Sequence, residues 1–187
     1  SRGLGDVYKR QDYYTGACHK WMCAPKGSSF LYVAKNFQKG MSPQIMSWGE
    51  EGDDPGPSQF LMDFQWQGTK DMSAFLAIPS AIRFLQKNKW KEKSVISKNL
   101  ISHLAGRLKH ILGTESLFKN KDWIGQMISH PLPTNSPINL KDILWNDFKI
   151  EVPIFEWKKR NFIRVSAHFY NDQKDMDHLI KALKEIF

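Results

Sequence analysis

The sequence predicts an α/β fold, and three observations support this prediction. Short runs of aromatic and β-branched residues, which are typical of strands, occur near the start of the chain and again in its last third. Two long stretches between them repeat apolar residues at the three- and four-residue spacing of an amphipathic helix. The 187 residues are 41% hydrophobic and 25% charged, which is the balance of a globular protein with a buried core.

The first expected elements are two strands joined by a compact loop. Residues 13–17 suit the end of a buried strand, residues 18–28 form the loop, and residues 30–33 form the second strand. Segment 35–58 is rich in Gly, Pro, Ser and acidic residues, and its strongest turn signal is Asp53-Asp54-Pro55-Gly56-Pro57. We expect a long loop there, of the kind that is usually functional in a compact domain.

Two amphipathic helices follow. We expect the first over residues 71–87, with Asp71 as its N-cap and a kink at Pro79. The second covers residues 94–112 and stops at Gly113, a residue suited to a helix C-terminus. The apolar faces are formed by Phe75, Leu76, Ile78, Ile82, Phe84 and Leu85 in the first helix, and by Ile96, Leu100, Leu104, Leu108 and Ile111 in the second.

The last third of the chain has the pattern of a small α/β unit. Its expected elements are strand 126–132, helix 139–148, strands 152–157 and 162–169, and a final helix that begins at Asn171 or Asp172. The inner face of the final helix is expected to consist of Met176, Leu179, Ile180, Leu183 and Ile186.

Charge and composition exclude several kinds of partner. The net charge is +8, but the basic residues are spread along the chain, and the densest run, at residues 87–93, suits a solvated junction between two helices. With no nucleic-acid motif and no apolar stretch of roughly 18 residues, we expect neither a nucleic-acid partner nor a membrane one. Cys18, His19 and Cys23 have no second ligand pair, so we expect no metal. The two cysteines make no disulfide framework, and no signal peptide is visible, which favours a cytoplasmic location.

Residues 1–11 differ from the rest of the chain. They show no hydrophobic period, and Asp6-Val7-Tyr8-Lys9-Arg10-Gln11 resembles the translation of a transposon end used to prepare sequencing libraries. We therefore expect a non-native leader over 1–11, with the protein's own sequence beginning near Asp12 and continuing from residues upstream that are missing. An ordinary N-terminal tail is the alternative.

Lys20 is the first candidate for chemistry. It lies in Ala17-Cys18-His19-Lys20-Trp21, just after the first expected strand, and Ala24-Pro25-Lys26-Gly27 and the second strand follow. A lysine in a tight loop after a strand is placed as a Schiff-base lysine must be, because partial burial lowers the pKa of its amine and makes it nucleophilic. From the residues alone, an ordinary exposed loop lysine is the favoured interpretation.

Two further segments contain residues suited to ligand binding. In Trp66-Gln67-Gly68-Thr69-Lys70-Asp71, Gly68 permits a tight turn and Thr69 offers a hydroxyl and an amide that suit a phosphate. In the strand Ile163-Arg164-Val165-Ser166-Ala167-His168-Phe169-Tyr170-Asn171, the planar guanidinium of Arg164 suits a carboxylate. Each segment is weak when taken alone.

Together, and in this order, the three segments resemble the class V aminotransferase family, whose members depend on pyridoxal phosphate. The resemblance covers Asp12 to Phe187. It implies that Lys20 forms the Schiff base with pyridoxal phosphate, that His19 lies beside the cofactor phosphate, and that Arg164 binds the α-carboxylate of the substrate. It also implies a homodimer, in which Gly68 and Thr69 reach the phosphate held by the partner subunit. Relatives carry a polar residue where this chain has Ala17, which implies that one phosphate contact is missing here.

The resemblance also implies a domain division and a reaction class. The fold would be the C-terminal part of a fold-type I enzyme, with the end of the large cofactor-binding domain at 12–114 and a small α/β domain at 115–187. The segments around Gly68 and Arg164 resemble the isopenicillin N epimerase-like members, which act at the α-carbon of an amino acid or a derivative. A carbon–sulfur lyase or an aminotransferase of the same family is the alternative. A persulfide mechanism is not expected, because residues 151–164 contain no cysteine and leave no room for the loop that would bear one.

The same resemblance places an aspartate for the pyridine nitrogen upstream of the Lys20 strand. We therefore expect a truncated chain that is inactive by itself. Two non-enzymatic hypotheses remain beside this one: a basic binding module without a cofactor, and a degenerate relative that keeps the fold as a scaffold.

Overall fold

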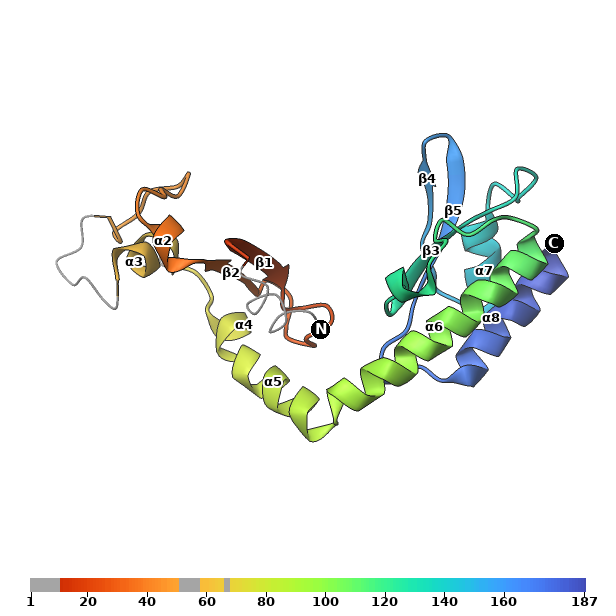
Figure 1. The fold of residues 1–187 in the computed structure, drawn as a ribbon, viewed down its shortest axis with the longest axis horizontal. Helices are drawn as coiled ribbons and strands as arrows, with labels where there is room; N and C mark the ends of the chain where they lie inside the picture. Colours follow the sequence, from red (N-terminus) through yellow and green to blue (C-terminus); the bar gives the residue numbers. More distant parts are fainter. Residues whose placement is uncertain (1–10, 51–57, 66–67) are drawn as a thin grey trace. The chain divides into compact units, whose positions relative to one another are not determined.

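Two short antiparallel strands begin the part of the chain that the structure describes. The computed structural model covers residues 11–50, 58–65 and 68–187 (Figure 1), without the side chain of residue 121. Strand β1 (Tyr13–Ala17) pairs with β2 (Ser29–Val33), as the sequence predicts. Gly16 lies opposite Phe30, and a β-carbon on Gly16 would come within 2.8 Å of the Phe30 ring, so any larger residue here would require the ring to move. Tyr13 is 53% exposed, so β1 is only partly covered by the described residues.

The segment expected to be a long loop contains one short helix. Helix α2 (Lys35–Gln38) follows β2 directly, and helix α3 (Gln59–Gln65) comes just after the end of the expected loop. The amide of the Gln38 side chain donates to the carbonyl of Val33 at 2.9 Å, which ties α2 to the end of β2. The predicted turn at 53–57 lies outside the described residues.

The first predicted amphipathic helix is two helices. Helix α4 (Ser73–Leu76) and helix α5 (Ile78–Lys87) are separated at Ala77, and Pro79 lies in the first turn of α5. A proline is tolerated there because the first turn leaves its amides unpaired in any case. Asp71 is not the N-cap: it lies one residue earlier, and its carboxylate accepts a hydrogen bond from the backbone amide of Ser73 at 2.8 Å.

Helix α6 (Trp90–Leu112) is the longest element, and it begins four residues before the predicted start at Ser94. It ends at Gly113, whose φ of 60° is the left-handed C-cap conformation that was expected. Its buried face is formed by Trp90, Ser97, Ile101, Leu104, Ala105, Leu108 and Leu112. The predicted face was partly wrong, because Ile96 is 60% exposed.

A three-stranded antiparallel sheet follows α6. Its strands are β3 (Met127–Pro131), β4 (Ile154–Trp157) and β5 (Arg160–Ser166), in the spatial order β3-β5-β4. A short 3-10 helix η1 (Lys121–Trp123) precedes β3, and helix α7 (Leu140–Phe148) lies between β3 and β4 in the chain. The predicted strands and helix occupy the same places within a few residues at each end.

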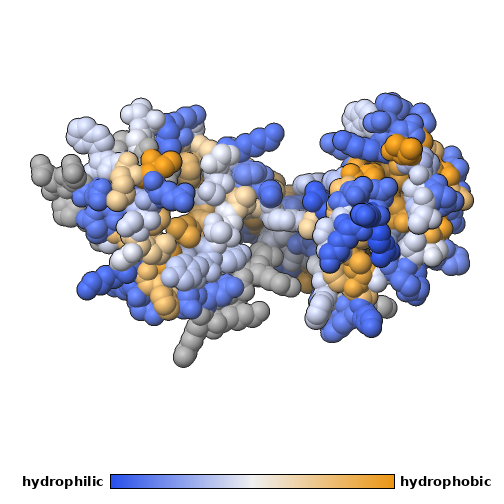
Figure 2. Space-filling view, turned by 90° about the horizontal axis from the view of Figure 1, so that it is seen from above, coloured by the Kyte–Doolittle hydropathy of each residue, from blue (hydrophilic) through white to orange (hydrophobic). Residues whose placement is uncertain are grey.

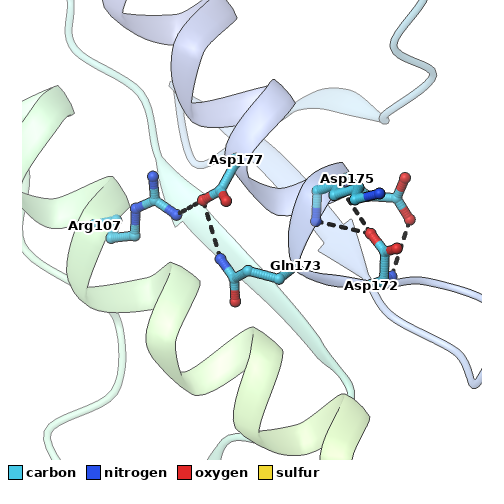
Figure 3. Close-up of polar contacts among 6 residues, drawn as sticks. Arg107, Asp172, Gln173, Asp175 and Asp177 are labelled. Atoms are coloured by element: carbon cyan, nitrogen blue, oxygen red, sulfur yellow. Dashed lines mark hydrogen bonds and ion pairs between the residues drawn. The ribbon is translucent and has the colours of Figure 1, made fainter.

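Helix α8 (Gln173–Ile186) closes the chain and confirms the prediction that the last helix starts after Asp172. Asp172 and Asp175 form a capping box, in which each carboxylate accepts a hydrogen bond from the backbone amide of the other (Figure 3). Arg107 of α6 forms an ion pair with Asp177, which also accepts a hydrogen bond from Gln173 at 3.0 Å (Figure 3). Helices α6 and α8 thus lie side by side (Figure 1).

The largest core lies among α6, α8, α7 and one face of the three-stranded sheet. It consists mainly of aliphatic side chains, among them Ile101, Leu104, Leu108, Ile128, Leu144, Ile163, Val165, Leu179, Ile180 and Leu183. A much smaller cluster in the first part of the chain contains Cys18, Ala24 and Ala81. These clusters correspond to two compact units, residues 1–88 and 89–187. The predicted domain boundary after residue 114 would fall after α6, and it stays a prediction.

Both units also present apolar side chains outside their cores. Figure 2 shows hydrophobic residues interspersed with hydrophilic ones on the surface that it displays. Trp48 and Leu76 in the first unit are 82% and 76% exposed, and Ile138 in the second is fully exposed. None of the helices in the described residues is long and apolar enough to cross a membrane.

Candidate functional site

The loop between β1 and β2 is closed by backbone hydrogen bonds at its base. The amide of Cys18 donates to the carbonyl of Ser28, and the amide of Ala24 donates to the carbonyl of Cys18, each at 3.0 Å. The hydroxyl of Ser28 is fully buried and donates to the carbonyl of Pro25 at 2.9 Å. The base of the loop is therefore fixed, because its polar groups are paired inside the loop.

Lys20 and His19 project from this fixed loop. The carbonyl of Lys20 accepts a hydrogen bond from the amide of Cys23 at 3.1 Å, which closes a tight turn directly after the lysine. His19 lies 3.4 Å from the carbonyl of Ser28 through Nδ1, an arrangement in which Nδ1 donates and Nε2 is left for another partner. Both side chains are exposed in this chain. The structure thus brings the two predicted cofactor residues together on one turn.

Gly68 and Thr69 lie in the same compact unit as Lys20. The φ of Gly68 is +99°, which glycine adopts readily and other residues do not. Thr69 follows with an exposed side chain, four residues before α4 begins. Trp66 and Gln67, which complete the predicted motif, lie outside the described residues. The backbone at Gly68 has the tight turn that the sequence predicts.

Arg164 lies in the middle of β5, opposite Ser129 of β3. Its neighbours Ile163 and Val165 point into the core and are 0% and 3% exposed, so the alternation of the strand turns Arg164 to the other face. Its backbone amide donates to the carbonyl of Pro153 at 2.9 Å, which fixes the strand at this position. Within the described ranges its guanidinium is in no ion pair. Arg164 belongs to the second compact unit.

The two thiols of the Lys20 loop are poor candidates for chemistry of their own. Burial raises the pKa of both Cys18 and Cys23, so the reactive thiolate form is disfavoured. In the part of the chain that the structure describes, no group of three or more His, Cys, Asp or Glu side chains could hold a metal ion.

The sequence analysis did not predict that Arg160 belongs to the same strand as Arg164. The predicted strand began at Phe162, whereas β5 begins at Arg160. The missed signal was the alternation of side chains along the strand. Arg160, Phe162 and Arg164 belong to one face, and Asn161 and Ile163 belong to the other. A second arginine therefore lies on the same strand face as Arg164.

Comparisons with known proteins show the family of the chain. The family model described as aminotransferase class-V matches residues 8–179. The chain belongs to the class V aminotransferase family. Its relatives include an isopenicillin N epimerase of Amycolatopsis lactamdurans, 32% identical over 94% of this chain, and one of Streptomyces clavuligerus, 28% identical over 92%. A probable chloroplastic L-cysteine desulfhydrase of Arabidopsis thaliana is 25% identical over 92% of this chain.

The chain spans about half the length of the curated relatives it matches, namely 47% and 46% of the two epimerases. Solved structures show the same fold. A cysteine desulfurase from Thermococcus onnurineus has a TM-score of 0.74 at 18% identity, over 93% of this chain and 46% of that one. The cystine lyase C-DES, solved with its product cysteine persulfide, has a TM-score of 0.73 at 19% identity, over 96% and 48%. The predicted α/β fold of fold-type I enzymes is therefore confirmed.

Proposed function

We propose that this chain supplies the cofactor lysine and the substrate arginine of a pyridoxal-phosphate enzyme. It would act at the α-carbon of an amino acid or an amino-acid-derived molecule, as an epimerase like its isopenicillin N epimerase relatives. The observation that supports this most directly is the position of Lys20 on a tight turn soon after β1, whose base is fixed by the paired backbone of Cys18 and Ser28. The partial burial expected of Lys20 is not found among the described residues.

The chemistry of the side chains fits pyridoxal phosphate. Lys20 provides an exposed primary amine, which is the group that bonds to the cofactor aldehyde. A phosphate can be held by hydroxyl and backbone donors, which Thr69 and the left-handed backbone at Gly68 supply, and Nε2 of His19 can donate to it when both ring nitrogens carry a proton. When bound, the cofactor withdraws electrons from the α-carbon of the substrate, so that its proton becomes removable.

Residues of the chain orient the substrate and move its proton. The guanidinium of Arg164 binds the α-carboxylate bidentately and so fixes the orientation of the α-carbon. The amine of Lys20 takes the proton from that carbon and can return it. Delivery of a proton to the opposite face of the α-carbon, by water or by a second acidic group, gives epimerisation. The absence of an ion pair at Arg164 supports its role, because no carboxylate among the described residues competes with a substrate.

A carbon–sulfur lyase is the second candidate, and the L-cysteine desulfhydrase relatives favour it. Their identities of 25% and 24% are below the 32% of the epimerase, which is why we place epimerisation first. A cysteine-dependent persulfide route is not proposed. Strands β4 and β5 are joined by a turn of only Lys158 and Lys159, and both cysteines of the chain lie in the Lys20 loop.

The proposed enzyme is a cytoplasmic homodimer in which Thr69 contacts the phosphate held by the partner subunit. In the chain extended by its expected upstream residues, mixing the variants Lys20→Ala and Thr69→Ala, each expected to be inactive, tests this sharing. If the site is shared, mixed dimers contain one site with both residues intact and recover a fraction of the activity. If every mixture stays inactive although the protein sediments as a dimer, the site is not shared between subunits.

Covalent trapping tests the cofactor lysine directly. The chain is incubated with pyridoxal phosphate and reduced with borohydride, and the modified peptide is located by mass spectrometry. Modification is expected at Lys20 and absent from the variant Lys20→Ala. The matched control is Lys26→Ala, which removes another exposed lysine of the same loop and should leave the labelling of Lys20 unchanged. Labelling spread equally over surface lysines would refute the assignment.

The reaction class follows from the products of amino-acid substrates. Inversion detected by chiral chromatography supports the epimerase, keto acid with sulfide marks a lyase, and keto acid with transferred nitrogen marks an aminotransferase. A dimer that ignores pyridoxal phosphate would indicate a scaffold, and salt-dependent retention on polyanions without cofactor binding would indicate a basic binding module.

A further inference from the structure

Helix α5 packs against the loop that carries Lys20. The two elements share an apolar cluster of small, buried side chains with larger, partly buried ones around them: Cys18, Ala24 and Ala81, with Met22, Phe30 and Ile78. Ile78 and Ala81 belong to α5, and the other members come from the loop and from β2. Cys18 is only 1% exposed, so the cluster excludes water from the base of the loop.

Both legs of the turn that bears Lys20 belong to this cluster. Cys18 precedes the lysine by two residues, and Ala24 follows it by four. The amide of Ala24 donates to the carbonyl of Cys18 at 3.0 Å, which joins the legs at the level of the cluster. Nearer the tip, the amide of Cys23 donates to the carbonyl of Lys20 at 3.1 Å. Lys20 therefore lies at the tip of a small closed turn, and the base of that turn packs on α5.

One side of α5 makes this contact, and both ends of the helix are fixed. Ile82, the residue after Ala81, is 40% exposed and lies outside the cluster. Pro79 has a fixed φ that suits the first turn of a helix. At the other end, the backbone amide and the side-chain amide of Asn88 both donate to the carbonyl of Phe84, at 3.0 and 2.9 Å. The helix is therefore a firm support for the loop.

A lysine amine needs such a support because its own side chain is flexible. Four carbons separate the amine from the backbone, and rotation about their bonds spreads its position. Reaction with an aldehyde requires the two groups to approach closely, and a displacement of about 1 Å can slow a reaction about a hundredfold. The fold acts on the amine through the backbone at Lys20, and the cluster fixes that backbone.

We propose that Ile78 and Ala81 are positioning residues for Lys20. The inference rests on the proposed function, in which other residues hold the cofactor phosphate and Lys20 must meet the aldehyde. Ile78 and Ala81 act through Cys18 and Ala24: they set where the turn lies, and the turn sets where the amine lies. Helix α5 thus has a role in the reaction although it carries none of the proposed site residues.

Trapping with two aldehydes tests this positioning. The whole chain is treated with pyridoxal phosphate or with pyridoxal, which lacks the phosphate, and is then reduced with borohydride. Mass spectrometry gives the rate of modification at Lys20 relative to Lys26, another exposed lysine of the loop. In the unsubstituted chain we expect pyridoxal phosphate to favour Lys20, because its phosphate is bound, and pyridoxal to modify both lysines at similar rates.

The matched variants are Ile78→Ala and Ile82→Ala, which make the same change on the same helix. Ile78→Ala should lower the rate at Lys20 about ten- to a hundredfold with pyridoxal phosphate, and change it by less than about twofold with pyridoxal. Ile82→Ala should leave both rates within about twofold, because its side chain is outside the cluster. Ile78→Val keeps a branched side chain in the cluster and should restore most of the rate.

The thiols of the loop report the packing without the cofactor. A maleimide should modify the exposed Cys23 faster than the buried Cys18. Ile78→Ala should raise the rate at Cys18 several-fold and leave that at Cys23 unchanged, with the same circular dichroism spectrum as the unsubstituted chain. If Ile78→Ala does not fold, Ala81→Val takes its place. It crowds the same contact without leaving a cavity, and the same changes are expected.

Four results would overturn the inference. Equal trapping by pyridoxal phosphate in Ile78→Ala and Ile82→Ala would do so and leave the proposed function standing, since Lys20 would still be the lysine that is modified. An equal fall with both aldehydes would mean that the variant has lost the loop itself. No change at Cys18 in Ile78→Ala would show that α5 does not support the loop. If the unsubstituted chain shows no preference of pyridoxal phosphate for Lys20, the proposed function fails and the inference fails with it.

Discussion

The indole of Trp90, the first residue of α6, stacks on the buried imidazole of His168 with ring centroids 4.4 Å apart and planes within 22°. His168 comes two residues after the end of β5, and its other neighbour in the stack is Tyr170, at 4.9 Å. The stack therefore fixes the chain that leaves β5 against the first turn of α6.

Removing the indole should free the first turn of α6. Trp90 is 7% exposed, so Trp90→Ala is expected to lower the free energy of unfolding by about 3–5 kcal/mol. Amide hydrogen exchange should rise most over the first turn of α6. Urea unfolding followed by circular dichroism measures the first effect. Trp145→Ala, on α7 and 53% exposed, is the control and should cost far less; equal losses would mean that the stack is not specific.

The two isoleucines of α6 test which face of the helix is buried. Ile101 is fully buried and Ile96 is 60% exposed, although the sequence pattern places Ile96 on the apolar face. Ile101→Ala should lower the free energy of unfolding by about 2–5 kcal/mol, because it leaves a cavity in the core. Ile96→Ala makes the same chemical change with little burial and should cost less than about 1 kcal/mol. A reversed order in urea unfolding would contradict the face that the structure shows.

His130 should make stability depend on pH. Burial lowers the pKa of this 1%-exposed imidazole below its usual 6.5, against smaller opposing effects of Thr114 and Glu115. The unfolded chain therefore takes up a proton first, and stability is lost as the pH falls below about 6.5. Above that pH both states are neutral at this residue, so its contribution is constant.

The comparison with His130→Gln isolates this contribution. Urea unfolding of both proteins is measured from pH 8 down to pH 5. The variant is expected to be less stable at pH 8, because Nε2 of His130 is 3.1 Å from the hydroxyl of Thr114 and that contact is lost. Toward pH 5 the two stabilities should converge. Curves that stay parallel would show that His130 titrates equally in the folded and unfolded states.

Because of the capping box, substitutions of Asp172 should lower the free energy of unfolding by different amounts. Its carboxylate accepts from the amides of Lys174 at 2.7 Å and Asp175 at 3.3 Å, which are otherwise unpaired at the start of α8. Asp172→Ala should cost about 0.5–2 kcal/mol of unfolding free energy. Asp172→Asn keeps an acceptor oxygen and should retain most of the stability. Equal losses for both substitutions would mean that hydrogen bonding is not what the side chain contributes.

The sequence predicted best the elements whose ends have local chemical signals. Gly113 and Asp172 mark helix ends because a left-handed glycine and a capping carboxylate act within one turn. The start of α6 has no such signal: Lys89 is the N-cap with a φ of 52° and no side-chain bond, and Trp90 is helical because it packs on His168, far along the sequence. Tertiary contacts of this kind cannot be read from periodicity.

The same reasoning applies to the candidate site. The sequence predicted five site residues because the order of their motifs is visible in it: Lys20, His19, Gly68, Thr69 and Arg164. The first four lie on two backbone turns, and each turn is formed by residues close together in the sequence. Arg160 was missed because the start of β5 depends on its pairing with Trp157 across a turn of two lysines, both at positive φ. Lysine is an uncommon residue in such a turn, so no turn signal is visible at these two positions.

The interval between Arg160 and Arg164 has a consequence for comparing sequences. Side chains of a strand alternate with a period of two, so residues separated by an even number of positions share a face and residues separated by an odd number do not. Deleting one residue between the two arginines, such as Asn161, would turn one of them toward the core. Among related chains with two arginines on this strand, only those with an even interval between them place both arginines on one face of the sheet.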